Sequence, residues 1–356
     1  MKKIIVALIL FALDGLAMFL FKTFPGFFFP AYRNFSKSWT ALLASFTSSF
    51  RIAVWDIAAP CLALLILLSL IIALIKRKNF LKRLSDLVLL LSLLTFLAVF
   101  GWMLNHYAPE LSEELSLEVR EYSYDELYET TEYYLNRASE YALKMKRDEQ
   151  GHALKNDFYE MAKIAGSSYN RLAEEYPVFQ GTDVRVKKLS LVGEYLMYNG
   201  IIGMYMPITA EAGVPGSVPN AVLGFTMAHE AAHRLGLAGE EEANFAAFLA
   251  CSRSEDLRMN YSGYYNAFSY CFSALYKADP EKALALYESH DDEGAIALKT
   301  DRKDTSEVYR KYESPLREVS DQINDSYLKA FSEENGIQSY GQVVDYLIAW
   351  HLQKDR

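Results

Sequence analysis

The chain has 356 residues and a net charge of −9, and nearly all of its acidity follows residue 108. This balance argues against nucleic-acid binding, which needs a basic surface. Only three cysteines are present, at 61, 251 and 271, which excludes a disulfide scaffold and a CxxC zinc site. The spacing leaves open whether Cys251 and Cys271 pair or are free buried thiols. Apolar residues make up 51% and crowd the first hundred positions, as in a membrane anchor followed by one domain.

Three apolar stretches are each long enough to cross a bilayer core, which takes about 20 residues. They cover residues 4–21, 57–75 and 84–104. The first begins with Lys2 and Lys3, as a signal peptide would, but no small-residue cleavage site follows it. We therefore expect an uncleaved anchor. Asp14 is a charged group within that stretch, and it either pairs with another helix or marks a function.

Basic residues predict the orientation of these spans. The loop KRKNFLKR, residues 76–83, carries five Lys and Arg, and basic loops stay in the cytoplasm. The N-terminus is then cytoplasmic as well, and the loop 23–56 lies outside. We predict a multi-pass cell-membrane protein in contact with the lipid bilayer. Residues 1–104 would form its membrane region and residues 105–356 an extracytoplasmic domain.

The predicted fold class is mainly α, because helical periodicity dominates residues 105–356. A short strand is expected within 182–192, and the segment 201–214 is expected to be an edge strand or an extended loop interrupted by Pro207. The turn-rich GVPGSVPN follows. Helices are predicted over 110–148, 154–175, from about 221, from 240, and over 262–277, 280–288, 305–333 and 339–353.

The sequence HEAAH, residues 229–233, is an HExxH motif on one of the predicted helices. Positions i and i+4 share a helix face, so His229 and His233 can present two imidazoles to one metal ion. Glu230 lies beside them, where it can take a proton from a metal-bound water. An HExxH also arises by chance in about one such chain in a hundred, so the surroundings of the motif matter.

A zinc site of this kind needs a third protein ligand. In HExxHxxGxxH it would be a histidine at position 239, which here is Gly239. The glycine turn 236–239 leads to a second helix that begins EEE, and a catalytic zinc commonly takes His₂Glu plus water. We predict Glu242 as the third ligand, since it would lie inside that helix on the face of Ala246 and Leu249. Glu240 and Glu241 would lie at the helix start, where exposed carboxylates are ordinary.

Asn244 could be a hydrogen-bonding partner of a metal ligand or an ordinary surface amide, and the sequence favours the two interpretations equally. An oxyanion-stabilising donor is also needed for hydrolysis.

At this point a family resemblance appears. HEAAHRLGLAGEEEANFAAFLAC, residues 229–251, resembles the HExAH…ExEAN signature of the domain-of-unknown-function 3810 family. The segments GWMLNHYAPELSEEL, GMYMPITAEAGV, NYSGYYNAF, NDSYLKA and SYGQVVDYL resemble further parts of that family. The resemblance implies a bacterial multi-pass membrane protein with a zincin-like domain, and it places the motif residues at His229, Glu230, His233 and Glu242. The chain departs from the family at Gly239, often Arg, and at Ala210, often Gly.

Within the NYSGYYNAF segment the resemblance offers Tyr261, Tyr264 and Tyr265 as oxyanion donors, although core packing is the commoner role of tyrosine in a chain with 25 of them.

The expected function is that of a membrane-anchored zinc metallopeptidase, with Zn²⁺ held by His229, His233 and Glu242 and with Glu230 as general base. Segment 201–212 would bind a peptide as an added strand. The substrate, whether a peptide, a protein or a cell-wall cross-link, is not specified. The alternative is a non-catalytic envelope protein whose zinc site is structural or vestigial. Intramembrane proteolysis is less favoured, because the motif lies some 120 residues beyond the last span.

Overall fold

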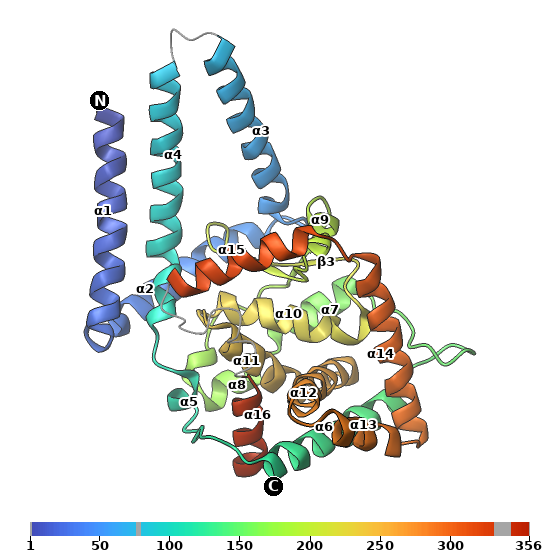
Figure 1. Ribbon diagram of the computed structural model, residues 1–356. Coiled ribbons are helices and arrows are strands. Elements are labelled where there is room, and N and C mark those ends of the chain that lie inside the picture. The colour runs from blue at the N-terminus through green and yellow to red at the C-terminus, as the bar shows by residue number, and fades with distance from the viewer. Residues whose placement is uncertain (1, 76–79, 331–342, 356) are drawn as a thin grey trace.

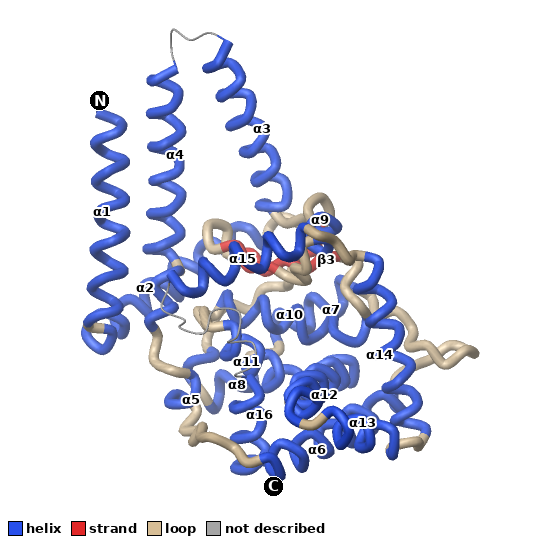
Figure 2. Tube along the Cα trace, viewed as in Figure 1, coloured by secondary structure: helices blue, strands red, loops and turns tan. Residues whose placement is uncertain are grey.

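The computed structural model describes residues 2–75, 80–330 and 343–355. Figure 1 shows three long helices that rise from one side of a helical domain. Three short strands, red in Figure 2, lie on that same side. The helices are α1 (Lys2–Thr23), α2 (Pro25–Ser48), α3 (Val54–Ile75), α4 (Phe80–Gly101), α5 (Leu111–Glu114), α6 (Tyr124–Lys144), α7 (Phe158–Ser167), α8 (Asn170–Glu175), α9 (Gly193–Tyr198), α10 (Asn220–Arg234), α11 (Glu240–Ser252), α12 (Leu257–Ala278), α13 (Pro280–Ser289), α14 (Glu293–Lys311), α15 (Leu316–Ala330) and α16 (Val343–Trp350).

The three predicted spans correspond to α1, α3 and α4, each 22 residues long and apolar enough to cross a membrane. Lys3 of α1 forms an ion pair with Asp86 of α4, so these two helices run in the same direction. The N-terminus of α1, the C-terminal end of α3 and the N-terminal end of α4 all lie on the side away from the domain (Figure 1). The basic ends of the spans are therefore opposite the domain, as the charge pattern predicts. Asp14 is buried beside Thr95 of α4.

The stretch 23–56 was expected to be an external loop, but most of it forms the helix α2. Its buried positions recur every three to four residues, at Phe29, Tyr32, Ser36, Thr40, Ala44 and Thr47. That spacing is the signature of a helix with one packed face. The Ser36 hydroxyl donates to the carbonyl of Gly101, the last residue of α4. Trp39 packs so closely on Gly101 that a side chain there would meet the indole at 2.8 Å.

The small sheet has the order β1-β3-β2, with β1 (Lys187–Leu189) parallel to β3 (Glu211–Pro215) and β2 (Met204–Met206) antiparallel to it. Both predicted β segments therefore contain strands. Ala210, in the turn between β2 and β3, has φ of +53°, a left-handed conformation that favours glycine. This conformation gives a physical reason for the glycine that the family resemblance implies at this position.

Two buried charges join the sheet to the start of α3. The Lys187 ammonium donates to the carbonyls of Thr47, Phe50 and Ile52 and lies 3.8 Å from the Glu211 carboxylate. Glu211 accepts hydrogen bonds from the backbone N–H groups of Val54 and Trp55, at 2.9 and 3.1 Å. Asp56 in turn accepts from the backbone N–H groups of residues 190–192. The α2–α3 connection is thus fixed to the domain.

Replacing Lys187 by Met is expected to destabilise the protein by about 3–5 kcal/mol, because Glu211 would stay buried without its cation. Lys188→Met is the matched control. Its side chain is on the other face of the strand, over the ring of Phe158, and it forms no ion pair with the described residues. Thermal unfolding in detergent measures both. Equal loss in the two variants would contradict the role of the buried pair.

The main core joins α6, α7, α10, α11, α12, α14 and α16. Three expected helices are interrupted. Residues 154–175 divide between α7 and α8 at residues 168–169. Residues 110–148 form α5, an extended stretch and α6, because Ser123 starts a new helix with a capping box to Glu126. Residues 305–333 divide between α14 and α15 around residues 312–315. The first part of the expected helix 339–353 falls in 331–342, outside the described residues.

Candidate metal centre

The motif helix α10 is buried over nearly its whole length, and a Schellman motif ends it. Gly236 has φ of +96°. The N–H of Leu237 donates to the carbonyl of Ala232 at 3.2 Å, and the N–H of Gly236 donates to that of His233 at 3.0 Å. This turn brings the Leu237 carbonyl within 2.7 Å of His233 Nδ1. The end of the helix therefore positions one of the motif histidines.

Three side chains place ligand atoms around one point. His229 Nε2 and His233 Nε2 are 3.1 Å apart, and the Glu240 carboxylate lies 3.3 Å from the first and 3.8 Å from the second. Ligand atoms bound tetrahedrally to zinc at 2.0–2.1 Å lie roughly 3.3 Å from one another. The donor set and spacing therefore fit a zinc ion. The side chains of the three residues keep 12%, 9% and 17% of their surface exposed, so none of them is fully enclosed.

Glu242, the third ligand that the sequence predicted, lies elsewhere. Its carboxylate accepts a hydrogen bond from the backbone N–H of Leu111 at 2.6 Å. The helix α11 begins at Glu240, and the side chain of this first glutamate lies beside the two histidines. Glu242 is two residues later, about 200° further around the helix. The cluster that the described residues form is His229, His233 and Glu240.

The second ring nitrogens of the histidines have different partners. With the Leu237 carbonyl as acceptor, His233 Nδ1 carries the proton and Nε2 keeps its lone pair for a metal. Asn244 is buried beside His229 and favours its protonated form. The Asn244 amide oxygen also accepts from the Tyr270 hydroxyl at 3.1 Å. The interpretation of Asn244 as a partner of a metal ligand thus agrees with its buried position. The interpretation of Asn244 as a surface amide does not.

The charges in this cluster are set by burial and by one another. Burial, together with the charge of His229, lowers the pKa of His233 to about 4, so this imidazole is neutral at pH 7. Burial opposes protonation of His229, but the hydrogen bond and charge of Glu240 prevail and raise the pKa of His229. Burial raises the pKa of Glu230 to about 8 against the attraction of His229. Glu230 is therefore a proton-binding group poised near neutral pH.

Glu230 is held against the strand segment that was expected to bind substrate. A side chain at Gly203, just before β2, would come within 2.3 Å of Glu230 Oε1. The other oxygen, Oε2, is buried and has no hydrogen-bond partner among the described residues. An unpartnered buried carboxylate oxygen is costly in a folded protein, so it indicates a functional position.

Gly203→Ala is expected to lower any activity that depends on Glu230 by at least about tenfold, because the new methyl group would displace the carboxylate. Metal content should not change, since the atoms nearest to the new methyl group belong to Glu230 and not to a histidine. Gly213→Ala, which would meet the side chain of Leu189 instead, is the control for general damage to the sheet. Unchanged activity in Gly203→Ala would contradict this contact.

Gly236→Ala tests the helix end. The left-handed conformation costs an alanine about 1 kcal/mol, and its Cβ would also lie 3.3 Å from Asn105. A shift of the Leu237 carbonyl should weaken zinc binding by about 10–100-fold, the usual effect of losing a partner of a metal ligand. Competition with a zinc chelator measures the affinity. A loss of stability with unchanged zinc affinity would show that the turn does not hold His233.

The three tyrosines considered for oxyanion stabilisation have other partners. The Tyr261 hydroxyl donates to buried Asp301. Tyr264 stacks on Tyr141 and lies under the Arg137 guanidinium. Tyr265 lies beside Thr305. Sequence reasoning missed Tyr270, which bonds Asn244, and whose pKa is raised by burial and by the charge of Glu240. Tyr270 lies six residues beyond Tyr264, on the same helix as the other three tyrosines, and its position in the sequence did not distinguish it from them.

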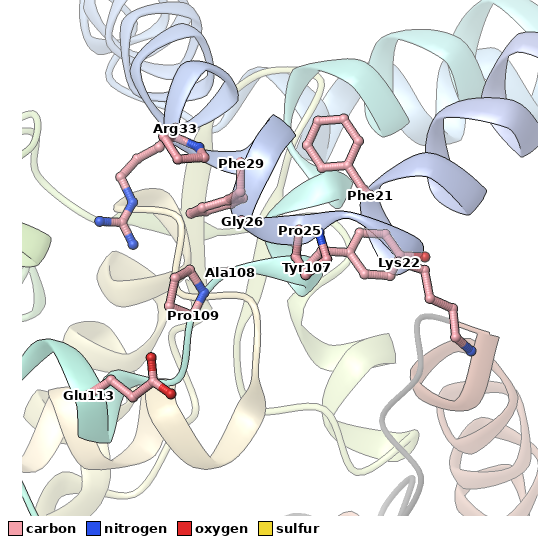
Figure 3. Close-up of a pocket in the computed structure, with 11 residues that line it drawn as sticks. Phe21, Lys22, Pro25, Gly26, Phe29, Arg33, Tyr107, Ala108, Pro109 and Glu113 are labelled. Carbon is pink, nitrogen blue, oxygen red and sulfur yellow. The ribbon is translucent and has the colours of Figure 1, made fainter.

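A cavity of about 460 Å³ lies apart from this cluster, where α1 turns into α2. Figure 3 shows Phe29 and Tyr107 along it, with Lys22 and Arg33 on opposite sides. None of its lining residues belongs to α10 or α11.

The chain is thus a mostly helical membrane protein with a partly buried cluster of two histidines and one glutamate. A family model described as "Protein of unknown function (DUF3810)" matches residues 32–348, and the chain belongs to that family. No curated protein and no solved structure matches it. Family membership therefore brings no known activity with it.

Proposed function

We propose that this protein is a membrane-anchored zinc metallopeptidase that hydrolyses a peptide or amide bond outside the cytoplasmic membrane. The observation that carries the proposal is the convergence of His229 Nε2, His233 Nε2 and the Glu240 carboxylate, whose Oε2 lies 3.3 Å from the first and whose Oε1 lies 3.8 Å from the second. Two histidines and a carboxylate with a remaining open position are a common catalytic zinc set. Among the described residues, no fourth His, Cys, Asp or Glu joins the cluster.

A zinc ion bound by these residues would supply Lewis acidity and lower the pKa of a bound water to about 7. Glu230 takes the proton of the attacking water and passes it to the leaving amine. Its position beside His229 and its raised pKa suit both steps. The Leu237 carbonyl orients the imidazole of His233, and Asn244 is buried beside His229.

The edge strand β2 supports a peptide as the substrate. It pairs with β3 on one side, and α10 packs against both strands. Gly203 at its start lies against Glu230. A peptide added along the outer edge of β2 would therefore bring its backbone close to the general base. The orientation across the membrane is part of the proposal and rests on Lys2, Lys3, Lys82 and Arg83, which lie away from the domain.

The direct test is the metal content of the purified protein, with hydrolysis of quenched-fluorescent peptides of randomised sequence as a second readout. We expect about one zinc per chain, and loss of hydrolysis on chelation that zinc restores. A protein that contains no zinc even after zinc-loaded refolding would overturn the proposal. Bound zinc with a fourth protein ligand would favour the alternative, a structural site in a partner-binding envelope protein.

A further inference from the structure

The outer face of α2 exposes large apolar side chains, with Asn34, Ser38 and Ser45 between them, and no described segment of the chain covers it. Phe27, Phe35, Leu42, Phe46 and Phe50 are between 44% and 79% exposed. They recur at steps of four, seven or eight residues, so they form one stripe along the helix and its end. An exposed stripe of this length is unusual on a surface that faces water.

The charged side chains of α2 all point toward the domain. The helix has two charged residues, Arg33 and Lys37. Arg33 pairs with Glu114, and the Lys37 ammonium donates to the carbonyls of Val178 and Gln180 at 2.9 and 2.7 Å. The aromatic stripe therefore carries no charge.

The position of α2 identifies what covers this stripe. The helix connects the end of α1 to the start of α3, and its Trp39 contacts the last residue of α4. All three spans thus meet α2 at the level where they leave the membrane (Figure 1). Leu191 and Tyr195, 62% and 61% exposed, lie near the same level beside the start of α3. An amphipathic helix at this level is covered by lipid headgroups and the adjoining acyl chains.

The candidate metal centre is fixed to the same level. Trp102 directly follows α4, and its indole N–H donates to the carbonyl of His233 at 2.7 Å. The Trp102 and His233 rings are 6.1 Å apart. Asn105 donates to Ser36 of α2 and lies against Gly236, the residue that ends the motif helix. The end of one span therefore holds His233 directly, and α2 is joined to the end of the motif helix through Asn105.

We infer that α2 lies in the headgroup layer of the bilayer and holds the metal centre at the membrane surface, so that its substrates are polypeptides anchored in the membrane and cleaved close to it. The substrate class rests on the proposed function, whereas the placement of α2 does not.

Spin labels test the placement without reference to activity. In a Cys61→Ala background, Leu42→Cys and Phe46→Cys each receive a nitroxide, and the protein is reconstituted in phosphatidylcholine–phosphatidylglycerol vesicles. Leu284→Cys is the matched control, an apolar residue 42% exposed on α13, on the far side of the domain. We expect labels at 42 and 46 to relax with oxygen, which dissolves in lipid, and the label at 284 with a water-soluble nickel chelate. Equal nickel accessibility at all three positions would overturn the inference.

Anchored peptides test the substrate class. Quenched-fluorescent peptides of randomised sequence carry a palmitoyl chain and a flexible spacer of roughly four or roughly thirty residues. We expect the short spacer to be cleaved on the order of tenfold faster, because it keeps the bond at the surface. Equal rates, or faster cleavage with the long spacer, would overturn the substrate class. Zinc-loaded protein that cleaves neither peptide would instead overturn the proposed function, and the spin labels would still decide the placement.

Discussion

Glu230→Gln is expected to leave zinc bound and to slow peptide hydrolysis by about 10²–10⁴-fold, the usual contribution of a general base. Gln keeps the size of the side chain but cannot take a proton. It also removes a buried carboxylate whose Oε2 has no partner among the described residues. The folded protein should therefore be at least as stable as the wild type when metal is absent.

The measurement combines zinc content, hydrolysis rate and thermal unfolding on one preparation. Glu293→Gln, at an exposed helix start, controls for the effect of losing one carboxylate on purification and charge. If Glu230→Gln lost zinc together with activity, Glu230 would be a ligand or a structural residue rather than a base. If it hydrolysed peptides at the wild-type rate, the assignment of the base would be wrong.

The histidine pair was predictable because helix geometry alone fixes it. Residues 229 and 233 share a face wherever the helix lies, so a local pattern was enough. The three spans were predictable for a similar reason, since each is a continuous apolar run that meets the bilayer thickness without any tertiary information.

The third member of the cluster was not predictable, because it depends on a turn. Three adjacent glutamates differ by about 100° steps around the helix, so only one can face the histidines. Which one does so depends on the path from Gly236, at φ of +96°, to the first residue of α11. The sequence indicated a turn and a carboxylate-rich helix start but not their geometry. Exposed carboxylates are ordinary at a helix start, where the helix dipole favours them, so Glu240 did not differ from Glu241 in the sequence.

The helix α2 was missed for a different reason. Its apolar residues are interleaved with Ser, Thr and Asn, so it lacks the continuous run of a span, and it also contains Pro25 and Pro30. Pro25 stands at the first helical position, where proline is tolerated. Two faces, one against the domain and one outward, divide its apolar residues. The periodicity was present in the sequence. It could be assigned to a helix with two apolar faces only once the ends of α1, α3 and α4 were placed together.

Glu240→Ala is expected to weaken zinc binding by more than roughly 100-fold, beyond the usual effect of losing an outer partner of a ligand, because it removes one of three ligand atoms. Glu242→Ala should keep its zinc but lose about 1–3 kcal/mol of stability, because the Leu111 N–H would lose the acceptor it meets at 2.6 Å. Cobalt substitution adds a spectroscopic readout, since the visible bands of Co²⁺ change with ligand number. The two glutamates are neighbours on one helix, so a general defect in α11 would affect both variants alike, whereas a ligand separates them. Zinc loss in Glu242→Ala with zinc retained in Glu240→Ala would restore the spacing that the sequence first suggested and would require α11 to rotate when metal binds.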